Sequence, residues 1–72
     1  MGKKQNRNNI LDLHGVKHED VERLVENFVL LNEPPLTIIT GKSQMMGHIV
    51  TSKLSTLGFG WERNVGDVKV LK

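Results

Sequence analysis

The segment that decides the fold lies at positions 36–41 and reads Leu-Thr-Ile-Ile-Thr-Gly. It predicts a β-strand from Leu36 to Thr40, because β-branched side chains fill most of it and suit a buried, pleated surface. The strand ends at Gly41. Apolar residues then recur at the spacing of a helix, at Met46, Val50, Leu54 and Leu57. Gly58 fits the C-cap of that helix, because glycine tolerates the left-handed backbone that often follows a last turn.

The residues before this segment repeat the order of strand, turn and helix. A short apolar run from Ile10 to Leu13 predicts a buried strand, which ends at Gly15. An amphipathic helix is expected over Glu19 to Leu31, because apolar residues recur on one helical face. Those residues are Val21, Leu24, Val25 and Phe28. Asn32 and the pair Pro34-Pro35 end this helix.

Two more strands are predicted after the second helix, over Phe59 to Arg63 and Asp67 to Leu71. The residues between them, Asn64-Val65-Gly66, suit a tight connection, so the two strands should form a hairpin. The element order is β-α-β-α-β-β. A strand–helix–strand unit makes a right-handed crossover between parallel strands. If those strands are neighbours, the loops after Leu13 and Thr40 leave the sheet at one edge, where ligands of open α/β sheets bind.

Length and composition indicate one small domain. The chain has 72 residues, of which 38% are hydrophobic, so we expect a folded but small core. It has no cysteine, which excludes disulfides, zinc–thiolate sites and thiol nucleophiles and fits a reducing compartment. No run approaches the ~20 apolar residues that cross a bilayer, and the basic start lacks the apolar region of a secretory signal. We therefore expect a cytoplasmic monomer without a membrane partner.

Positive charge is concentrated at the amino end of the chain. Lys3, Lys4 and Arg7 lie within residues 1–9, which we expect to be a disordered basic tail ahead of a single domain at residues 10–72. Without these three, the chain carries seven basic and eight acidic side chains, a net charge of −1. The tail either adds affinity for phosphates without sequence preference or is only a solvated terminus.

The first loop carries a pair of side chains that suits proton transfer. Asp12 and His14 are two positions apart in a strand, so they point to the same face. An Asp beside a His can orient the imidazole for general acid–base catalysis, and Gly15 lets the backbone turn sharply enough to expose the pair. The alternative is a hydrogen-bonded strand end without a catalytic role. His14 and His18 are four apart, but Gly15 keeps them off one helix, so no structural zinc site is expected.

The second loop reads Thr40-Gly41-Lys42-Ser43 and connects a strand to a helix. Backbone N–H groups at a helix N-terminus favour anions, and Lys42 adds a mobile positive charge, so a phosphate-bearing ligand is expected there. The letters Gly-Lys-Ser also occur in the P-loop of nucleotide triphosphatases, but that motif needs a glycine where this chain has Leu36. The alternative is an ordinary connection with a surface lysine.

The remaining residues have simpler expected roles. Met45, Met46 and Gly47 either continue the second loop or form the first turn of the second helix, with Met46 in the core. His48 should face solvent or pack. Trp61 could offer a surface on which bases stack, but its place on the same strand face as Phe59 favours the core.

Two motifs resemble the signatures of the Smr (small MutS-related) domain family. Residues 11–15, Leu-Asp-Leu-His-Gly, followed by an acidic amphipathic helix, are similar to the opening element of Smr domains. Residues 38–42, Ile-Ile-Thr-Gly-Lys, are similar to the second signature, a strand that runs into Thr-Gly-x-Gly or His-Gly-x-Gly. Residues 59–71 are similar to the last two strands of the family, so the resemblance covers about residues 9–72.

The resemblance implies a fold, an activity and a set of site residues. The fold is a two-layer β-α-β-α-β-β sandwich of α/β (α+β) class, with a four-stranded mixed sheet and two helices. It is similar to the C-terminal domain of translation initiation factor three. Members are linked to nicking or cleavage of DNA or RNA, including messenger RNA on stalled ribosomes. Asp12 and His14 match the catalytic Asp-x-His of the family, Gly41 and Lys42 match its binding loop, and Ser43 replaces the second glycine of that loop.

We therefore expect a small endonuclease that acts on RNA or DNA, with Asp12 and His14 as catalytic residues. The expected nucleic-acid-binding residues are Gly15, Thr40, Gly41, Lys42, Ser43, Lys3, Lys4 and Arg7. On RNA, His14 would move a proton at the 2′-hydroxyl or the leaving oxygen. On DNA, a water nucleophile would be needed, with Mg²⁺ or Mn²⁺ held partly by Asp12.

Two alternatives stay open. A non-catalytic nucleic-acid- or ribosome-binding module would keep the fold and the phosphate loop. A protein-interaction module would differ in its response to salt, because added salt would leave its partner binding little changed.

Overall fold

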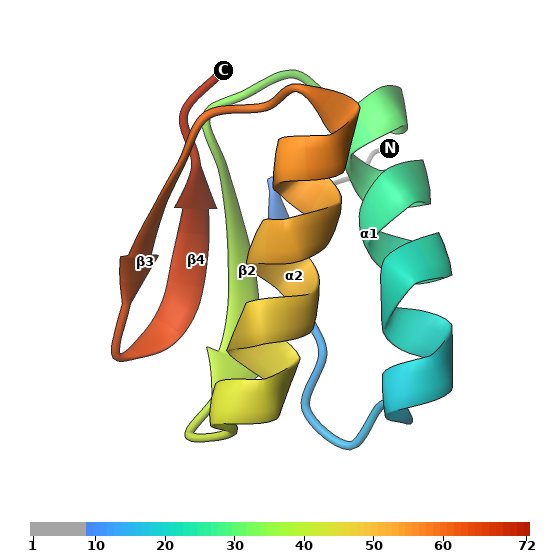
Figure 1. Ribbon diagram of the computed structural model, residues 1–72. Helices are drawn as coiled ribbons and strands as arrows, with labels where there is room; N and C mark the ends of the chain where they lie inside the picture. Colours follow the sequence, from blue (N-terminus) through green and yellow to red (C-terminus); the bar gives the residue numbers. More distant parts are fainter. Residues whose placement is uncertain (1–8) are drawn as a thin grey trace, which may run out of the picture.

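The computed structural model describes residues 9–72, and they form the elements in the predicted order (Figure 1). The bounds are β1 (Ile10–Asp12), α1 (His18–Leu31), β2 (Leu36–Gly41), α2 (Gln44–Leu57), β3 (Trp61–Asn64) and β4 (Gly66–Val70). The hairpin of β3 and β4 has Val65 at its tip, as the turn sequence predicts.

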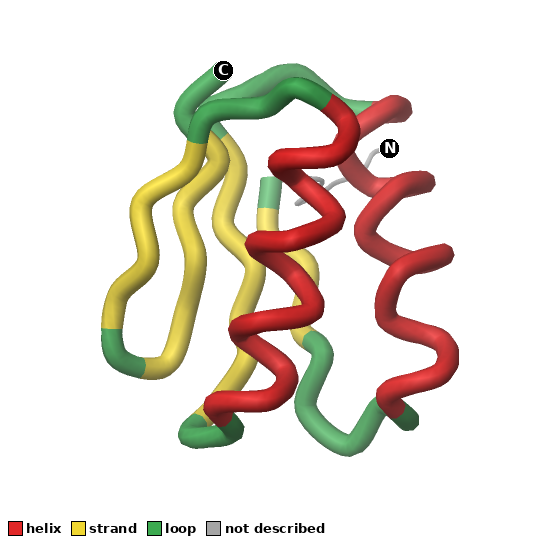
Figure 2. Tube along the Cα trace, viewed as in Figure 1, coloured by secondary structure: helices red, strands yellow, loops and turns green. Residues whose placement is uncertain are grey.

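The four strands form one sheet in the order β1-β2-β4-β3. β1 is parallel to β2, whereas β4 is antiparallel to both β2 and β3, so the sheet is mixed. The two helices lie side by side on one face of this sheet, and Figure 2 shows the two layers that result. The predicted α+β fold, with β1 and β2 as parallel neighbours, is confirmed.

The core lies between the sheet and the two helices. Burial alternates along β2, because successive side chains of a strand point to opposite faces. The buried apolar side chains from β2 are Leu36 and Ile38, and they meet Val21, Val25 and Val29 of α1, Met46, Val50 and Leu54 of α2, Val68 and Val70 of β4 and Leu13. Each fully buried aliphatic side chain contributes about 1.5–3 kcal/mol relative to an exposed one.

The ends of α2 follow from its sequence. Ser43 caps the N-terminus, and Gly58 caps the C-terminus in the left-handed conformation with φ at 89°. The helix begins at Gln44, so Met45, Met46 and Gly47 form its first turn and do not extend the loop. Met46 is buried in the core, which decides between its two expected roles.

The prediction that Trp61 belongs to the core is wrong. Its side chain is 38% exposed, and its indole N–H donates a hydrogen bond of 2.9 Å to the Ser55 hydroxyl on α2. The reason is position, because β3 is the edge strand of the sheet and all four of its residues are exposed. Phe59, which precedes the strand, is the aromatic residue that packs against the core.

Within residues 9–72, no helix is long and apolar enough to cross a membrane. Both helices have 14 residues, against the ~20 that a bilayer requires.

Candidate functional site

Three connections meet at one end of the molecule. The loops after β1 and β2 and the tip of the β3–β4 hairpin all lie at the end where α1 and α2 begin (Figure 1). The shared end follows from the topology, because the parallel strands β1 and β2 finish together and β4 starts there. The expectation that the first two loops emerge at the same edge is confirmed.

The loop after β1 is held by its own aspartate. The carboxylate of Asp12 accepts a hydrogen bond of 2.9 Å from the backbone N–H of His14. Both residues are exposed, while Leu13 between them is fully buried. Gly15 has a φ of 80°, a left-handed conformation that other residues rarely adopt. Asp12 therefore fixes the turn that presents His14, through the backbone and not through the imidazole ring.

The loop after β2 is held by a different set of hydrogen bonds. The Thr40 side chain is buried, and its hydroxyl donates a hydrogen bond of 3.3 Å to the Gly41 carbonyl. Gly41 has a φ of 67°, so a side chain there would be strained. The Ser43 hydroxyl accepts a hydrogen bond of 3.0 Å from the Met46 N–H. Lys42 is exposed, and it is the residue of this loop that can offer a charge to a ligand.

A groove lies between this second loop and the hairpin. It has a volume of about 460 Å³ and is lined by residues 40–44 and 63–66. That volume lies within the range of pockets that hold small ligands. Among the described residues that line it, Lys42 and Arg63 carry charge and none is acidic. Asp12, His14 and Gly15 do not line it, so the structure brings the second loop together with the hairpin and not with the first loop.

Arg63 is a site residue that the sequence analysis missed. Its guanidinium reaches from β3 to the first turn of α2 and donates a hydrogen bond of 3.1 Å to the Gln44 carbonyl. It lies directly over Gly47, where an added Cβ would stand 2.5 Å from the Arg63 guanidinium nitrogen Nη2. Gly47 is a buried glycine inside a helix, a position that costs about 1 kcal/mol relative to alanine. Such a glycine indicates a close approach, and here the approaching group is Arg63.

The first loop and the groove lie on opposite flanks of β2. Asp12 pairs with Ile39 on one flank, and Gly66 pairs with Gly41 on the other. Adjacent strands are about 4.8 Å apart, so β1 and β4 are separated by about 10 Å. A bound chain that crosses the end of β2 could therefore contact both His14 and the groove.

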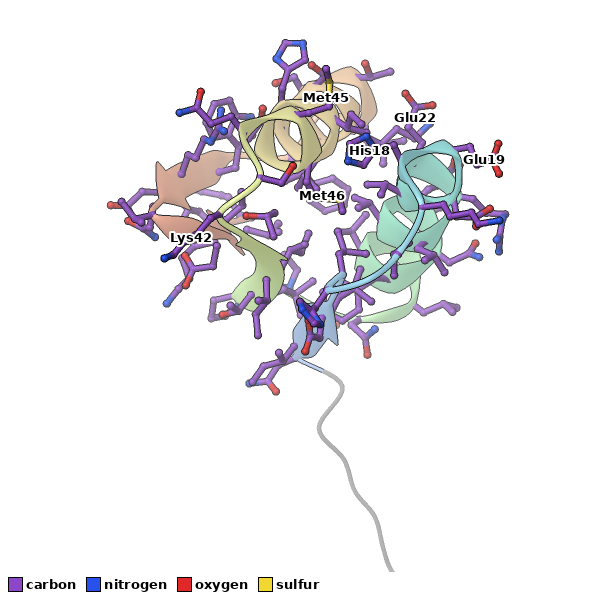
Figure 3. All side chains as sticks on the ribbon, turned by 90° about the horizontal axis from the view of Figure 1, so that it is seen from below. His18, Glu19, Glu22, Lys42, Met45 and Met46 are labelled. Atoms are coloured by element: carbon purple, nitrogen blue, oxygen red, sulfur yellow. The ribbon has the colours of Figure 1, made fainter. Side chains whose placement is uncertain are left out.

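Charge is divided across this end of the molecule. Figure 3 shows Lys42 on one side and Glu19 and Glu22 of α1 on the other. In the same view the His18 ring lies between them. The first turn of α1 also carries Asp20. An anionic ligand is thus attracted to the groove and repelled from α1.

The described residues do not build a metal site. Among residues 9–72, no group of three or more His, Asp or Glu side chains could hold a metal ion. Asp12 and Asp67 share a sheet face, but Ile39 of β2 stands between them, so they are about 10 Å apart. Asp67 instead accepts a hydrogen bond of 3.0 Å from the Asn64 side chain. Mg²⁺ or Mn²⁺ at Asp12 would need most of its ligands from a substrate and from water.

Three of the predicted binding residues, Lys3, Lys4 and Arg7, lie outside the described residues, as does almost all of the predicted tail. The structure describes the other predicted site residues, and they lie at the ends of β1 and β2 and in the loops that follow these strands.

Comparison with known proteins gives no relative on which to base a function. No protein family matches the chain. No curated protein and no solved structure matches it either. The similarity to Smr domains rests on the two sequence motifs.

Proposed function

We propose that this protein is a small cytoplasmic endonuclease of Smr type, which binds RNA or DNA in the groove and cleaves it beside β2. The observation that carries the proposal is the groove itself, which places Lys42 and Arg63 together without a neighbouring carboxylate in its lining. Arginine and lysine are the side chains that most often hold phosphate oxygens, arginine through two parallel hydrogen bonds.

The start of α2 supports an anion in the same place. The first N–H groups of a helix have no partner within the helix and carry a partial positive charge. The Ser43 hydroxyl accepts the N–H of Met46, and Gln44, the first residue of the helix, lines the groove. A phosphate there would interact with the helix end as well as with Lys42 and Arg63.

Cleavage is assigned to His14. On RNA, His14 would take the proton of a 2′-hydroxyl, whose oxygen attacks the adjacent phosphorus to form a 2′,3′-cyclic phosphate. The bond from phosphorus to the 5′-oxygen breaks, and the leaving oxygen takes a proton from water. Lys42 and Arg63 would stabilise the charge that develops on the phosphate. Asp12 acts on His14 by fixing the turn, so it is a positioning residue here.

A non-catalytic binding module is the second candidate, and one observation favours it. The Asp12 carboxylate is engaged with the backbone of its own loop, an arrangement that also serves a purely structural turn. In that case the groove would bind nucleic acid, or RNA on a ribosome, without cleaving it.

The test is cleavage of labelled single-stranded RNA, duplex DNA and ribosome-bound RNA, each with and without Mg²⁺ or Mn²⁺. Wild type is compared with His14→Ala and with His48→Ala. His48 is also exposed but lies within α2 and not in the loop after β1, so its variant is the matched control.

Cleavage that is lost in His14→Ala and kept in His48→Ala would support the nuclease. Salt-dependent binding without cleavage by wild type would favour the binding module. If wild type neither cleaves nor binds any of the three substrates, the proposal is wrong, and a protein partner becomes the better hypothesis.

A further inference from the structure

Val65 is the most exposed of the large apolar residues that the structure describes. It is 97% exposed at the tip of the β3–β4 hairpin, between the paired residues Asn64 and Asp67. The turn requires a glycine at position 66, where φ is 91°, but it does not require valine at 65. Tight turns favour Gly, Asn, Asp, Pro and Ser. Neither the turn nor the core accounts for this side chain.

The position of Val65 relates it to the groove. It is one of the residues that line the groove, together with Lys42 and Arg63. An apolar side chain thus stands at the rim of a cationic site. The Asn64 side chain donates to Asp67, which braces the hairpin directly below the tip.

We propose that the groove binds an unpaired nucleotide step, with phosphates at Lys42 and Arg63 and one base against Val65. This inference rests on the proposed function and names the class of substrate. A base in a duplex is stacked and paired, so its face is not available to a side chain without unstacking, whereas an unpaired base can swing out. Every base offers such a face, so an apolar side chain can contact it largely without regard to sequence.

The charge of the domain also favours a short single strand. A duplex presents phosphates along both strands, and the part of the chain after the basic start carries a net charge of −1. Two cations at the groove match two phosphates. For a single strand, two phosphates neutralised in the groove contribute about −1.4 to the slope of the logarithm of affinity against the logarithm of salt concentration.

The test is a double-mutant cycle between Val65 and the base. The ligands are an 8-nucleotide single strand of RNA and a sugar–phosphate strand of the same length without bases. Binding is measured by fluorescence anisotropy without metal, in a His14→Ala background so that the strand is not cut. The variants are Val65→Asn and, as a control, Leu31→Asn, because Leu31 is 80% exposed at the far end of α1 (Figure 1).

Val65→Asn should weaken binding of the strand with bases by about fivefold, because partial burial of a valine contributes about that much. It should leave binding of the base-free strand unchanged, and Leu31→Asn should change neither. Equal effects of Val65→Asn on both strands, or no effect on either, would refute the inference while leaving the groove as a phosphate site. Tighter binding of a duplex than of its single strand would also refute it. If neither strand binds to the protein in which Val65 is intact, the proposed function is wrong and the inference falls with it.

Discussion

At the scale of single residues, Gly47 and Arg63 form a pair. The absence of a side chain at position 47 lets the guanidinium lie over the first turn of α2, within hydrogen-bonding distance of the Gln44 carbonyl. The contact joins residues that are far apart in the chain, so neither residue alone indicates it. Together they place a fixed positive charge at the groove.

Gly47→Ala tests this pair. The new methyl group would displace the Arg63 guanidinium, which is the flexible end of its side chain, so the fold should tolerate it. Higher helix propensity, worth about 1 kcal/mol, offsets the lost hydrogen bond, and the free energy of unfolding should change by less than about 1 kcal/mol. Affinity for single-stranded RNA, measured by anisotropy, should fall as far as it does in Arg63→Ala.

The control for Gly47→Ala is Ser52→Ala, at an exposed position of the same helix, which should not affect binding. Loss of binding in Arg63→Ala alone would show that Gly47 does not position the arginine.

Ser43 is the residue at which the chain departs from the Smr signature, and it has a structural role. Its hydroxyl caps α2 through the Met46 N–H. Ser43→Ala should lower the free energy of unfolding by about 1 kcal/mol, whereas Ser43→Gly should cost only a few tenths, because glycine is tolerated at an N-cap. Urea denaturation measures both values. Equal losses for the two variants would show that the cap does not stabilise the helix.

At the scale of elements, β2 connects the core to the site. Ile38 is fully buried on the face of the sheet that the helices cover, while its neighbour Ile39 is half-buried on the opposite face. Ile38→Ala should lower the free energy of unfolding by about 2–5 kcal/mol, and Ile39→Ala by about 1 kcal/mol. Thermal denaturation of the two variants checks the difference. Similar losses for both would mean that the uncovered face of the sheet is covered in solution.

The order of elements could be predicted from local patterns, because strand and helix periodicities and the glycines at turns are properties of neighbouring residues. The signals at Gly41 and Gly58 are of this kind. Trp61 was misplaced because its burial depends on β3 being an edge strand, and strand order does not follow from local pattern. Arg63 was missed for the same reason, since its contact with Gln44 spans 19 positions. The sequence thus indicated one wall of the groove, and the fold supplied the other.

At the scale of the whole molecule, the division of charge decides how a nucleic acid can approach. The first turn of α1 is acidic, while the groove on the other side of the same end presents Lys42 and Arg63. A long polyanion laid across the helices would meet Glu19 and Glu22, so the favoured approach is over the hairpin and the second loop (Figure 3).

Single charge removals test this direction of approach. Lys42→Ala or Arg63→Ala should each reduce the magnitude of the salt slope for a single strand by about 0.7, because each removes one phosphate contact. Arg23→Ala removes the same charge from α1, where Arg23 pairs with Asp20 at 3.4 Å, and it should leave the slope unchanged. The slopes come from anisotropy titrations at several salt concentrations. The comparison separates contact from general attraction, because all three variants lose one positive charge and therefore shift the net charge equally. If Arg23→Ala lowers the slope as much as Lys42→Ala, the strand is attracted by net charge alone and the groove does not hold its phosphates.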